Sequence, residues 1–232
     1  MTTISIIGSG NMATAIGTRA AQHGHTVEVI SRNTAKAQAL ADQIGNGATG
    51  ATFGATPLGD IVIVAIPYTD TVSAVANYGE ALAGKILVDI SNPFNADASG
   101  LVTTPGNSAA QEIAAAAPEG ASVVKALNTI FGHILAQDKP LDAFLAGDST
   151  EAKAQVAAFL QSIDLRPLDA GGLQMASVLE WTGILLMGLA RNGAGFNLAL
   201  RAEVHCRPRS YRSSSAARSR PAQLRGTGRP GR

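Results

Sequence analysis

A glycine-rich turn near the start of the chain constrains the fold more than any other feature. The segment Gly8-Ser9-Gly10-Asn11-Met12-Ala13 has the spacing G-x-G-x-x-A and separates an apolar run at 3–8 from a helical pattern at 11–23. In such a unit the first glycine permits a tight turn, the second lets the backbone approach a pyrophosphate, and the small third residue allows close helix–strand packing. The helix N-terminus adds free N–H donors and a positive dipole end. The turn predicts a dinucleotide site, and a purely structural tight turn is the alternative.

Strand-like and helical patterns alternate from this turn to residue 170. The run Asp60–Pro67 is a nearly continuous series of valine and isoleucine, as expected for a central parallel strand that is buried on both faces. Further strands are expected at 26–31, 51–54, 85–91, 122–127, 141–147 and 165–170, and further helices at 35–44, 71–82, 108–116 and 150–162. This alternation predicts an α/β fold, a Rossmann-type, doubly wound and mainly parallel sheet with helices on both faces.

The pattern changes after Gly171 and Gly172. Residues 174–190 are apolar enough for a buried helix or an interface helix, 192–195 are expected to form a turn, and 196–204 a final short helix. We therefore expect a dinucleotide-binding domain over 1–170 and a small helical domain over 171–204.

The net charge of +1 hides two different compositions. Residues 207–232 carry eight arginines and no lysine or acidic residue, which leaves −7 for the rest of the chain. Arg, Ser, Pro and Gly dominate this end, so 205–232 are expected to be a disordered tail. The composition favours a non-native extension, such as an out-of-frame reading of GC-rich DNA. An arm that binds nucleic acid or an acidic partner is the less favoured alternative.

The remaining composition excludes several classes of protein. One cysteine excludes a disulfide framework and a cysteine-based zinc site, and none of the four histidines is spaced as a metal-binding pair. We expect no metal. No apolar run is expected to reach the roughly 20 residues of a membrane helix, and the N-terminus lacks signal-peptide features. The expected compartment is the cytoplasm, with no membrane partner.

The end of the second strand indicates which dinucleotide binds. An NAD site usually has Asp or Glu there to hold the ribose 2′-hydroxyl, whereas this chain has Ser31 and Arg32, with Lys36 one turn into the next helix. Ser31 can donate a hydrogen bond, Arg32 can pair with a phosphate and stack on adenine, and Lys36 can add a positive charge. These side chains predict NADP.

Ligands of open α/β sheets bind at the carboxyl ends of the strands, so the loops that follow later strands should complete the site. These loops are 66–69, 91–95 and 128–133, and a role as plain turns is the alternative for each. The residues assigned to the cofactor are Gly8, Ser9, Gly10, Asn11, Met12, Ser31, Arg32, Lys36, Ile66, Pro67, Tyr68, Asn92 and Pro93.

Taken together, these motifs resemble the NADPH:coenzyme F420 oxidoreductases. The resemblance rests on the glycine-rich turn, on Ser31-Arg32 with Lys36, on the 128–133 loop, on LRPLDAG at 165–171 and on RNG at 191–193. It spans residues 3–204, and the LRPLDAG and RNG segments are its more specific parts.

The resemblance implies a homodimer in which residues 171–204 carry the acceptor site and dimer contacts. Hydride would pass directly between nicotinamide C4 and C5 of the deazaflavin F420, which needs proximity and orientation rather than a catalytic acid or base. No catalytic residue is therefore assigned. The residues assigned to the acceptor are Asn128, Thr129, Ile130, Phe131 and His133.

The acceptor loop departs from the family pattern, so more than one acceptor stays open. Archaeal members of the family have a histidine at the position of Asn128 and a different loop after Ile130. A flavin, ferric iron or a quinone could be the acceptor, and the NADPH-binding domain of membrane ferric reductases also resembles this family. A non-catalytic NADP sensor is an alternative from another class. The helical domain of pyrroline-5-carboxylate reductases is too long for the residues after Gly171, and the catalytic lysine of β-hydroxyacid dehydrogenases has no counterpart after Lys153.

Overall fold

The structure is a computed structural model that describes residues 1–203 and residue 205. Residues 1–202 form one compact unit. The expected boundary between residues 170 and 171 stays a prediction. Apart from residue 205, the expected arginine-rich tail lies outside the described residues.

Eight strands form one sheet in the order β3-β2-β1-β4-β5-β6-β7-β8. The strands are β1 (Thr3–Ile7), β2 (Thr26–Ser31), β3 (Thr49–Thr52), β4 (Ile61–Val64), β5 (Ile86–Asp89), β6 (Ser122–Ala126), β7 (Leu141–Gly147) and β8 (Leu165–Asp169). The strand order reverses between β1 and β4, and the first six strands are parallel. The predicted doubly wound, mainly parallel sheet of the Rossmann type is confirmed.

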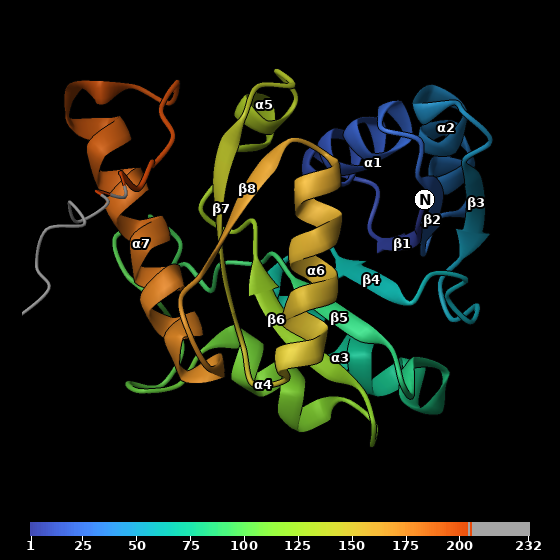
Figure 1. Cartoon of the computed structure of the whole chain (residues 1–232). Helices are drawn as coiled ribbons and strands as arrows, with labels where there is room; N and C mark the ends of the chain where they lie inside the picture. The colour runs from blue at the N-terminus through green and yellow to red at the C-terminus, as the bar shows by residue number, and fades with distance from the viewer. Residues whose placement is uncertain (204, 206–232) are drawn as a thin grey trace, which may run out of the picture. The chain divides into compact units, whose positions relative to one another are not determined.

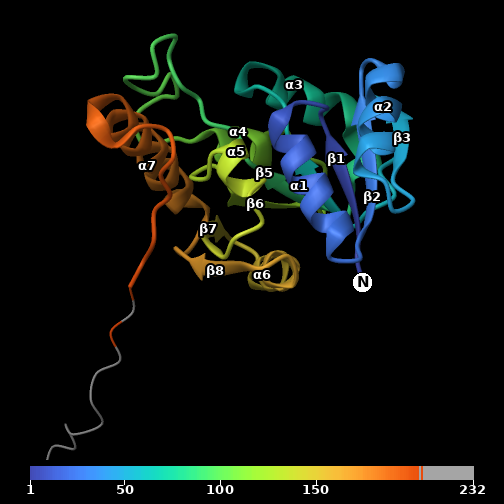
Figure 2. The same ribbon diagram turned by 90° about the horizontal axis from the view of Figure 1, so that it is seen from above.

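Helices cover both faces of this sheet (Figure 1). They are α1 (Asn11–Gln22), α2 (Thr34–Ile44), α3 (Tyr68–Tyr78), α4 (Ala109–Ala116), α5 (Gly132–Leu135), α6 (Thr150–Ser162) and α7 (Ala176–Leu189), with short turns η1 (Gly79–Leu82), η2 (Leu173–Met175) and η3 (Ala190–Ala194). Figure 2 shows α6 and α3 on opposite sides of the sheet. Ile4 of β1 packs in one core with Phe159 of α6, and Ile7 in a second core with Ile113 of α4, since strand side chains alternate between faces.

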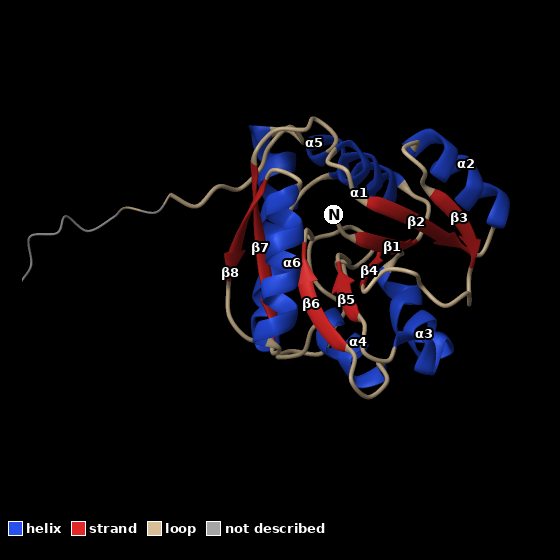
Figure 3. Ribbon diagram, turned by 45° about the vertical axis from the view of Figure 1, so that its right-hand side comes forward, coloured by secondary structure: helices blue, strands red, loops and turns tan. Residues whose placement is uncertain are grey.

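The last two strands, β7 and β8, run opposite to the first six. β7 is antiparallel to β6 and parallel to β8 (Figure 3). The chain leaves β6 at the carboxyl edge of the sheet, forms α5 there and returns along β7. The sequence of β7 is apolar like that of the parallel strands β1, β4 and β5, so its composition does not reveal this direction.

Two predicted elements need correction. The helix expected over 196–204 is wrong for residues 196–203, which form no helix. Phe196 is 48% exposed there, and a short helix needs a packed apolar face to be stable. The third strand starts at Thr49 rather than at Ala51, because it pairs with β2 from Glu28 onward.

Helix α7 packs one face against the body of the protein and exposes the other. Leu179, Leu186 and Ala190 are buried, whereas Trp181 and Leu185 are more than half exposed. With its flanking turns, α7 forms a 22-residue helical stretch, 173–194, whose length and mean hydropathy of 1.4 match a membrane span. It also contains Glu180, which is fully buried and bonded to β6, and this indicates a core helix of the fold.

The LRPLDAG segment forms β8 and the turn that follows it. Arg166 in β8 holds Asp142 in β7 through two hydrogen bonds, Nε to Oδ1 at 2.8 Å and Nη2 to Oδ2 at 2.6 Å. The backbone N–H of Ala202 donates to the same carboxylate at 2.7 Å. The Arg166 guanidinium holds the pKa of Asp142 below its usual range. The segment therefore joins the two outer strands to the end of the described chain.

This carboxylate should make stability depend on pH. Because the pKa of Asp142 is lower in the folded than in the unfolded state, its stabilisation is complete above about pH 4 and is lost as the pH falls through the folded-state pKa. We expect Asp142→Asn to lower the Tm by several degrees at pH 7 and to lose less Tm than the parent between pH 5 and pH 3. Thermal unfolding monitored by circular dichroism across this range checks it. The control Asp60→Asn alters an exposed ion pair with Lys85 and should follow the parent, and a D142N profile parallel to the parent's would contradict the role of Asp142.

Candidate functional site

The carboxyl ends of the parallel strands open into two cavities. The first, called the Arg32 cavity, has a volume of about 330 Å³. It is lined by Ile7, Gly8, Ser9, Gly10, Ile30, Ser31, Arg32, Phe53, Ala65, Ile66, Pro67, Asp70, Ser73, Ala74 and Asn77. The second, called the Asn128 cavity, has a volume of about 290 Å³. It is lined by Met12, Ile90, Asn92, Phe94, Leu127, Asn128, Thr129, Ile130, Phe131, Gly132, Gly183, Leu186 and Met187.

The glycine-rich turn takes part in both cavities. Gly8 has a φ of +130°, and a Cβ atom there would lie 2.2 Å from the carbonyl oxygen of Ala65, so only glycine fits this turn. A Cβ at Gly10 would meet nothing within 4 Å. Gly10 precedes α1, whose first turn has no side-chain cap and no acidic residue. The space beside Gly10 is therefore suited to an anion at the helix N-terminus.

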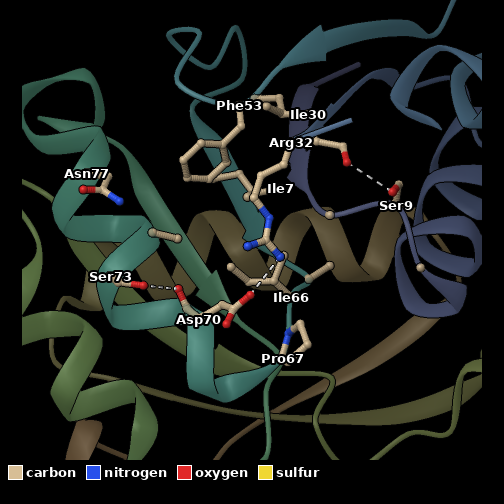
Figure 4. A pocket seen from close by; sticks show the side chains of 15 residues that line it. Ile7, Ser9, Ile30, Arg32, Phe53, Ile66, Pro67, Asp70, Ser73 and Asn77 are labelled. Atoms are coloured by element: carbon tan, nitrogen blue, oxygen red, sulfur yellow. Dashed lines mark hydrogen bonds and ion pairs between the residues drawn. The ribbon is translucent and has the colours of Figure 1, made fainter. Parts of the chain in front are cut away.

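Arg32 extends across the first cavity from the end of β2 (Figure 4). Its Nη2 donates to Oδ2 of Asp70, in the first turn of α3, at 2.9 Å. Ser31 and Ser9 face each other with their hydroxyl oxygens 3.3 Å apart. Lys36 does not line the cavity: it lies in the first turn of α2, where its backbone N–H donates to Asn33. Of the three residues predicted to select NADP, the structure thus places Ser31 and Arg32 at this cavity but not Lys36.

The far wall of the Arg32 cavity was not predicted. Phe53, which packs edge-on against Tyr78 with centroids 4.9 Å apart, follows β3, and Asp70, Ser73 and Asn77 belong to α3. The order of the sheet places these elements beside the glycine-rich turn. The spacing of Asp70 and Ser73 along one helix face is visible in the sequence, but which cavity that face lines is not.

A reciprocal pair of amides forms one wall of the Asn128 cavity. Asn128 Nδ2 donates to Asn92 Oδ1 and to the carbonyl of Leu179 in α7, each at 2.9 Å, and Asn92 Nδ2 donates to the carbonyl of Asn128 at 2.9 Å. Leu127, just before, has a φ of +61°, the left-handed region that costs a non-glycine residue energy. This turn in the backbone directs the 128–130 loop into the cavity.

Helix α7 closes this cavity because it contains Gly183. A Cβ at Gly183 would lie 2.9 Å from Asn92 Oδ1 and 3.0 Å from Phe94 Cζ. The glycine therefore lets the helix lie directly on the 92–94 loop. Leu186 and Met187 line the cavity, whereas Trp181 does not line it and is exposed.

A buried charge cluster lies beneath the Asn128 cavity. Lys125 Nζ donates to Asp89 Oδ2 at 2.7 Å, to the carbonyl of Ser91 at 2.6 Å and to Glu180 Oε1 at 2.8 Å, and all three charged side chains are fully buried. Burial raises the pKa of Glu180, and the nearby Lys125 opposes this shift. Asp89 also accepts from the backbone N–H of Ser91, so it caps the strand end as a structural residue. Sequence analysis did not find Lys125 or Glu180.

Four buried polar atoms around this cluster have no hydrogen-bond partner within the described residues. They are Ser91 Oγ, Asn128 Oδ1, Thr129 Oγ1 and Glu180 Oε2. Buried polar atoms are normally paired, so such atoms indicate a missing water or ligand. Asn128 and Thr129 line the cavity and can offer an acceptor and a hydroxyl to a polar group bound there. The residues present thus fit a mainly apolar ligand with a polar edge.

Several predicted site residues lie outside both cavities. Tyr68 donates to Glu112 Oε2 at 2.7 Å, and burial together with this bond raises the pKa of Tyr68 to about 12. Pro93 lines neither cavity. Asn11 and His133 line a separate groove along α1, where His133 Nε2 lies 3.0 Å from the carbonyl oxygen of Phe196. Their assignment to cofactor or acceptor stays a prediction.

The chain is similar to several known proteins. The sequence profile described as "NADP oxidoreductase coenzyme F420-dependent" matches residues 3–93. The F420-dependent NADP reductase of Methanocaldococcus jannaschii is 34% identical over 140 residues, 56% of this chain and 62% of the relative. The rat (Rattus norvegicus) metalloreductase STEAP3 is 31% identical over 181 residues, 76% of this chain and 35% of the relative.

The chain therefore spans about a third of the rat metalloreductase and less than two thirds of the methanogen reductase. Among solved structures, a candidate F420-dependent NADP reductase from Arthrobacter sp. FB24 superposes with a TM-score of 0.75. It is 25% identical, and the match covers 88% of this chain and all of that one.

Two glycine variants separate folding from phosphate binding. Gly10→Ala should keep the parent Tm, because Gly10 has φ −94° and open space at its Cβ position, yet weaken NADPH binding about tenfold, since the methyl group fills the approach to the helix N-terminus. Gly8→Ala should lower the free energy of unfolding by about 2–4 kcal/mol. Calorimetric titration and thermal unfolding of both variants measure this. Unchanged NADPH binding by G10A would contradict the phosphate assignment.

Proposed function

We propose that the chain, which is similar to coenzyme F420-dependent NADP oxidoreductases, transfers a hydride between NADPH or NADP⁺ and the deazaflavin coenzyme F420. The observation that carries this proposal is the position of the glycine-rich turn, which lines the Arg32 cavity with Gly8–Gly10 and the Asn128 cavity with Met12. One extended dinucleotide can follow this turn from one cavity to the other.

The Arg32 cavity would take the adenosine half of NADP. The free N–H groups at the start of α1 would bind the pyrophosphate, and Arg32 and Ser31 would bind the 2′-phosphate. Ile66 and Pro67 supply an apolar wall on the other side (Figure 4). Support comes from the charge at the end of β2, where an acidic residue selective for NAD is replaced by an arginine.

The Asn128 cavity would take the nicotinamide and the acceptor. NADPH supplies the hydride when it is bound, and reduction of the acceptor also takes up one proton. Leu127, Ile130 and Leu186 form apolar walls that exclude water, and the Asn92–Asn128 pair fixes the loop against which the rings would stack. Their contribution is proximity and orientation, so the absence of an assigned catalytic acid or base fits the reaction.

A metal ion is the second candidate for the acceptor. The similarity to the rat metalloreductase covers 76% of this chain and favours an NADPH-dependent reduction of ferric iron, directly or through a flavin. An assay must also distinguish these acceptors from a quinone, and an enzyme from a non-catalytic NADP sensor.

We further infer a cytoplasmic homodimer formed through the exposed face of α7. Val178, Trp181, Leu185 and Leu189 are each 42–55% exposed and recur at helical spacing. A contiguous apolar face of this kind normally marks an interface.

The acceptor can be identified by an anaerobic absorbance assay at the deazaflavin band. We expect rapid bleaching with NADPH and oxidised F420, and little with NADH, FMN or a ferric chelate. Arg32→Ala should raise the KM for NADPH by one to two orders of magnitude, since a charge-assisted contact contributes about 1.5–3 kcal/mol, and leave NADH turnover unchanged. The control Lys139→Ala removes an exposed cation outside both cavities and should behave as the parent.

Equal losses with NADPH and NADH in R32A would contradict the assignment of Arg32 to the 2′-phosphate. Tight NADPH binding without F420 bleaching would reject F420 as the acceptor, and turnover of the ferric chelate or FMN would then identify the acceptor instead.

The dimer has its own test. Leu185→Glu should reduce the mass in sedimentation equilibrium from twice the chain mass to 23.6 kDa, because a charge cannot be buried unpaired in an apolar interface. Leu58→Glu changes an equally apolar residue that is 67% exposed elsewhere and should leave the dimer intact. A parent protein that sediments as a monomer would reject the inferred interface.

A further inference from the structure

The hydrogen bond between Arg32 and Asp70 lies across the cavity that would hold the adenosine of NADP. Asp70 lies 38 positions further along the chain, yet its Oδ2 accepts from Arg32 Nη2 at 2.9 Å (Figure 4). Both side chains reach solvent, with 76% of the Arg32 side chain and 37% of the Asp70 side chain exposed. The pair therefore bridges β2 and α3 at the opening of the cavity.

Asp70 is held in place independently of Arg32. Its backbone N–H donates to the carbonyl of Pro67 at 2.9 Å, and its own carbonyl accepts from Ser73 Oγ at 3.1 Å. As the acidic residue in the first turn of α3, it is also stabilised by the helix dipole. The carboxylate thus stays beside the cavity whether or not Arg32 pairs with it.

A 2′-phosphate that binds Arg32 must come close to this carboxylate. The phosphate carries a charge of about −1.5 to −2 and is a stronger partner for a guanidinium than a carboxylate is. It can therefore replace Asp70 at Arg32. The Arg32–Asp70 bond is lost or shared, and two like charges then lie on either side of one guanidinium, which lowers the net gain.

A nucleotide without the 2′-phosphate meets a different situation. Such a nucleotide has no phosphate that pairs with the Arg32 guanidinium, so the Arg32–Asp70 bond can persist while the nucleotide binds. Asp70 therefore acts against NADP(H) and hardly against NAD(H).

We propose that Asp70 is a specificity-determining residue that opposes binding of the nucleotide 2′-phosphate at Arg32 and so speeds the release of NADP(H). This inference rests on the proposed use of NADP. When the phosphate leaves, Arg32 can pair with Asp70 again. Asp70 therefore lowers the affinity for NADP(H) and speeds its release in each turnover. Because related interfaces differ mainly in their dissociation rates, the effect belongs chiefly to release.

The test compares the parent with Asp70→Asn, which keeps the shape and the helix position but removes the charge. We expect D70N to bind NADPH and adenosine 2′,5′-bisphosphate about three- to fivefold more tightly, in line with the modest strength of exposed ion pairs. Binding of NADH and 5′-AMP should change less than twofold. Stopped-flow displacement should show NADPH leaving D70N more slowly by a similar factor. Asp60→Asn makes the same change in net charge away from the cavity and should match the parent.

The outcomes are distinct. Weaker NADPH binding by D70N would overturn the proposal, because Asp70 would then orient Arg32 for the phosphate, and unchanged binding would overturn it as well. A parent protein that binds NADH as tightly as NADPH, and AMP as tightly as the bisphosphate, would instead reject the proposed NADP preference, whatever D70N does. Thermal unfolding of D70N confirms that the compared proteins are folded.

Discussion

The contact between Lys125 and Glu180 holds the C-terminal helix on the sheet, and the second cavity exists because of it. A fully buried lysine is tolerated only when it is paired, and here Asp89, Glu180 and a backbone carbonyl surround its ammonium group. Removing one partner of such a cluster typically costs about 3–5 kcal/mol, because it leaves a charge unpaired in the core. The cluster fixes the rotation of α7, and this rotation turns Gly183 toward the 92–94 loop and leaves Trp181 on the outside.

The two cavities have different roles in the proposed reaction: one would bind the adenosine half of NADP, and the other the nicotinamide and the acceptor. The Arg32 cavity is shaped by charge: a helix N-terminus without an acidic residue, an arginine and a carboxylate that competes for it. The Asn128 cavity is shaped by apolar packing over a few buried polar atoms. Binding affinity can therefore be adjusted at the first cavity without changing the lining of the second, because the two cavities have no lining residue in common.

The predictions that succeeded concern local chemistry. The turn at Gly8–Ala13, the strand patterns and the basic end of β2 each depend on neighbours a few residues away, so spacing and residue type were sufficient to find them. What the sequence did not reveal concerns contacts over long distances. Tyr68 and His133, which were assigned to ligands, have Glu112 and the carbonyl of Phe196 as partners within the fold, and their assignment stays a prediction. The helix expected after residue 195 does not form in residues 196–203, where Phe196 is 48% exposed.

The sequence by itself determined the Rossmann-type sheet and the glycine-rich turn, and it showed the resemblance to the coenzyme F420-dependent NADP oxidoreductases. These features depend on short-range periodicity and on glycine geometry, which consecutive residues specify. Only the tertiary structure decided that β7 runs antiparallel to β6. It also decided that Lys125 pairs with Glu180, 55 positions away, and that Asp70 pairs with Arg32 across a cavity. Such pairs depend on the order of the strands and the packing of helices on them. A charged residue looks the same in the sequence whether its partner is water, a ligand or another element of the fold.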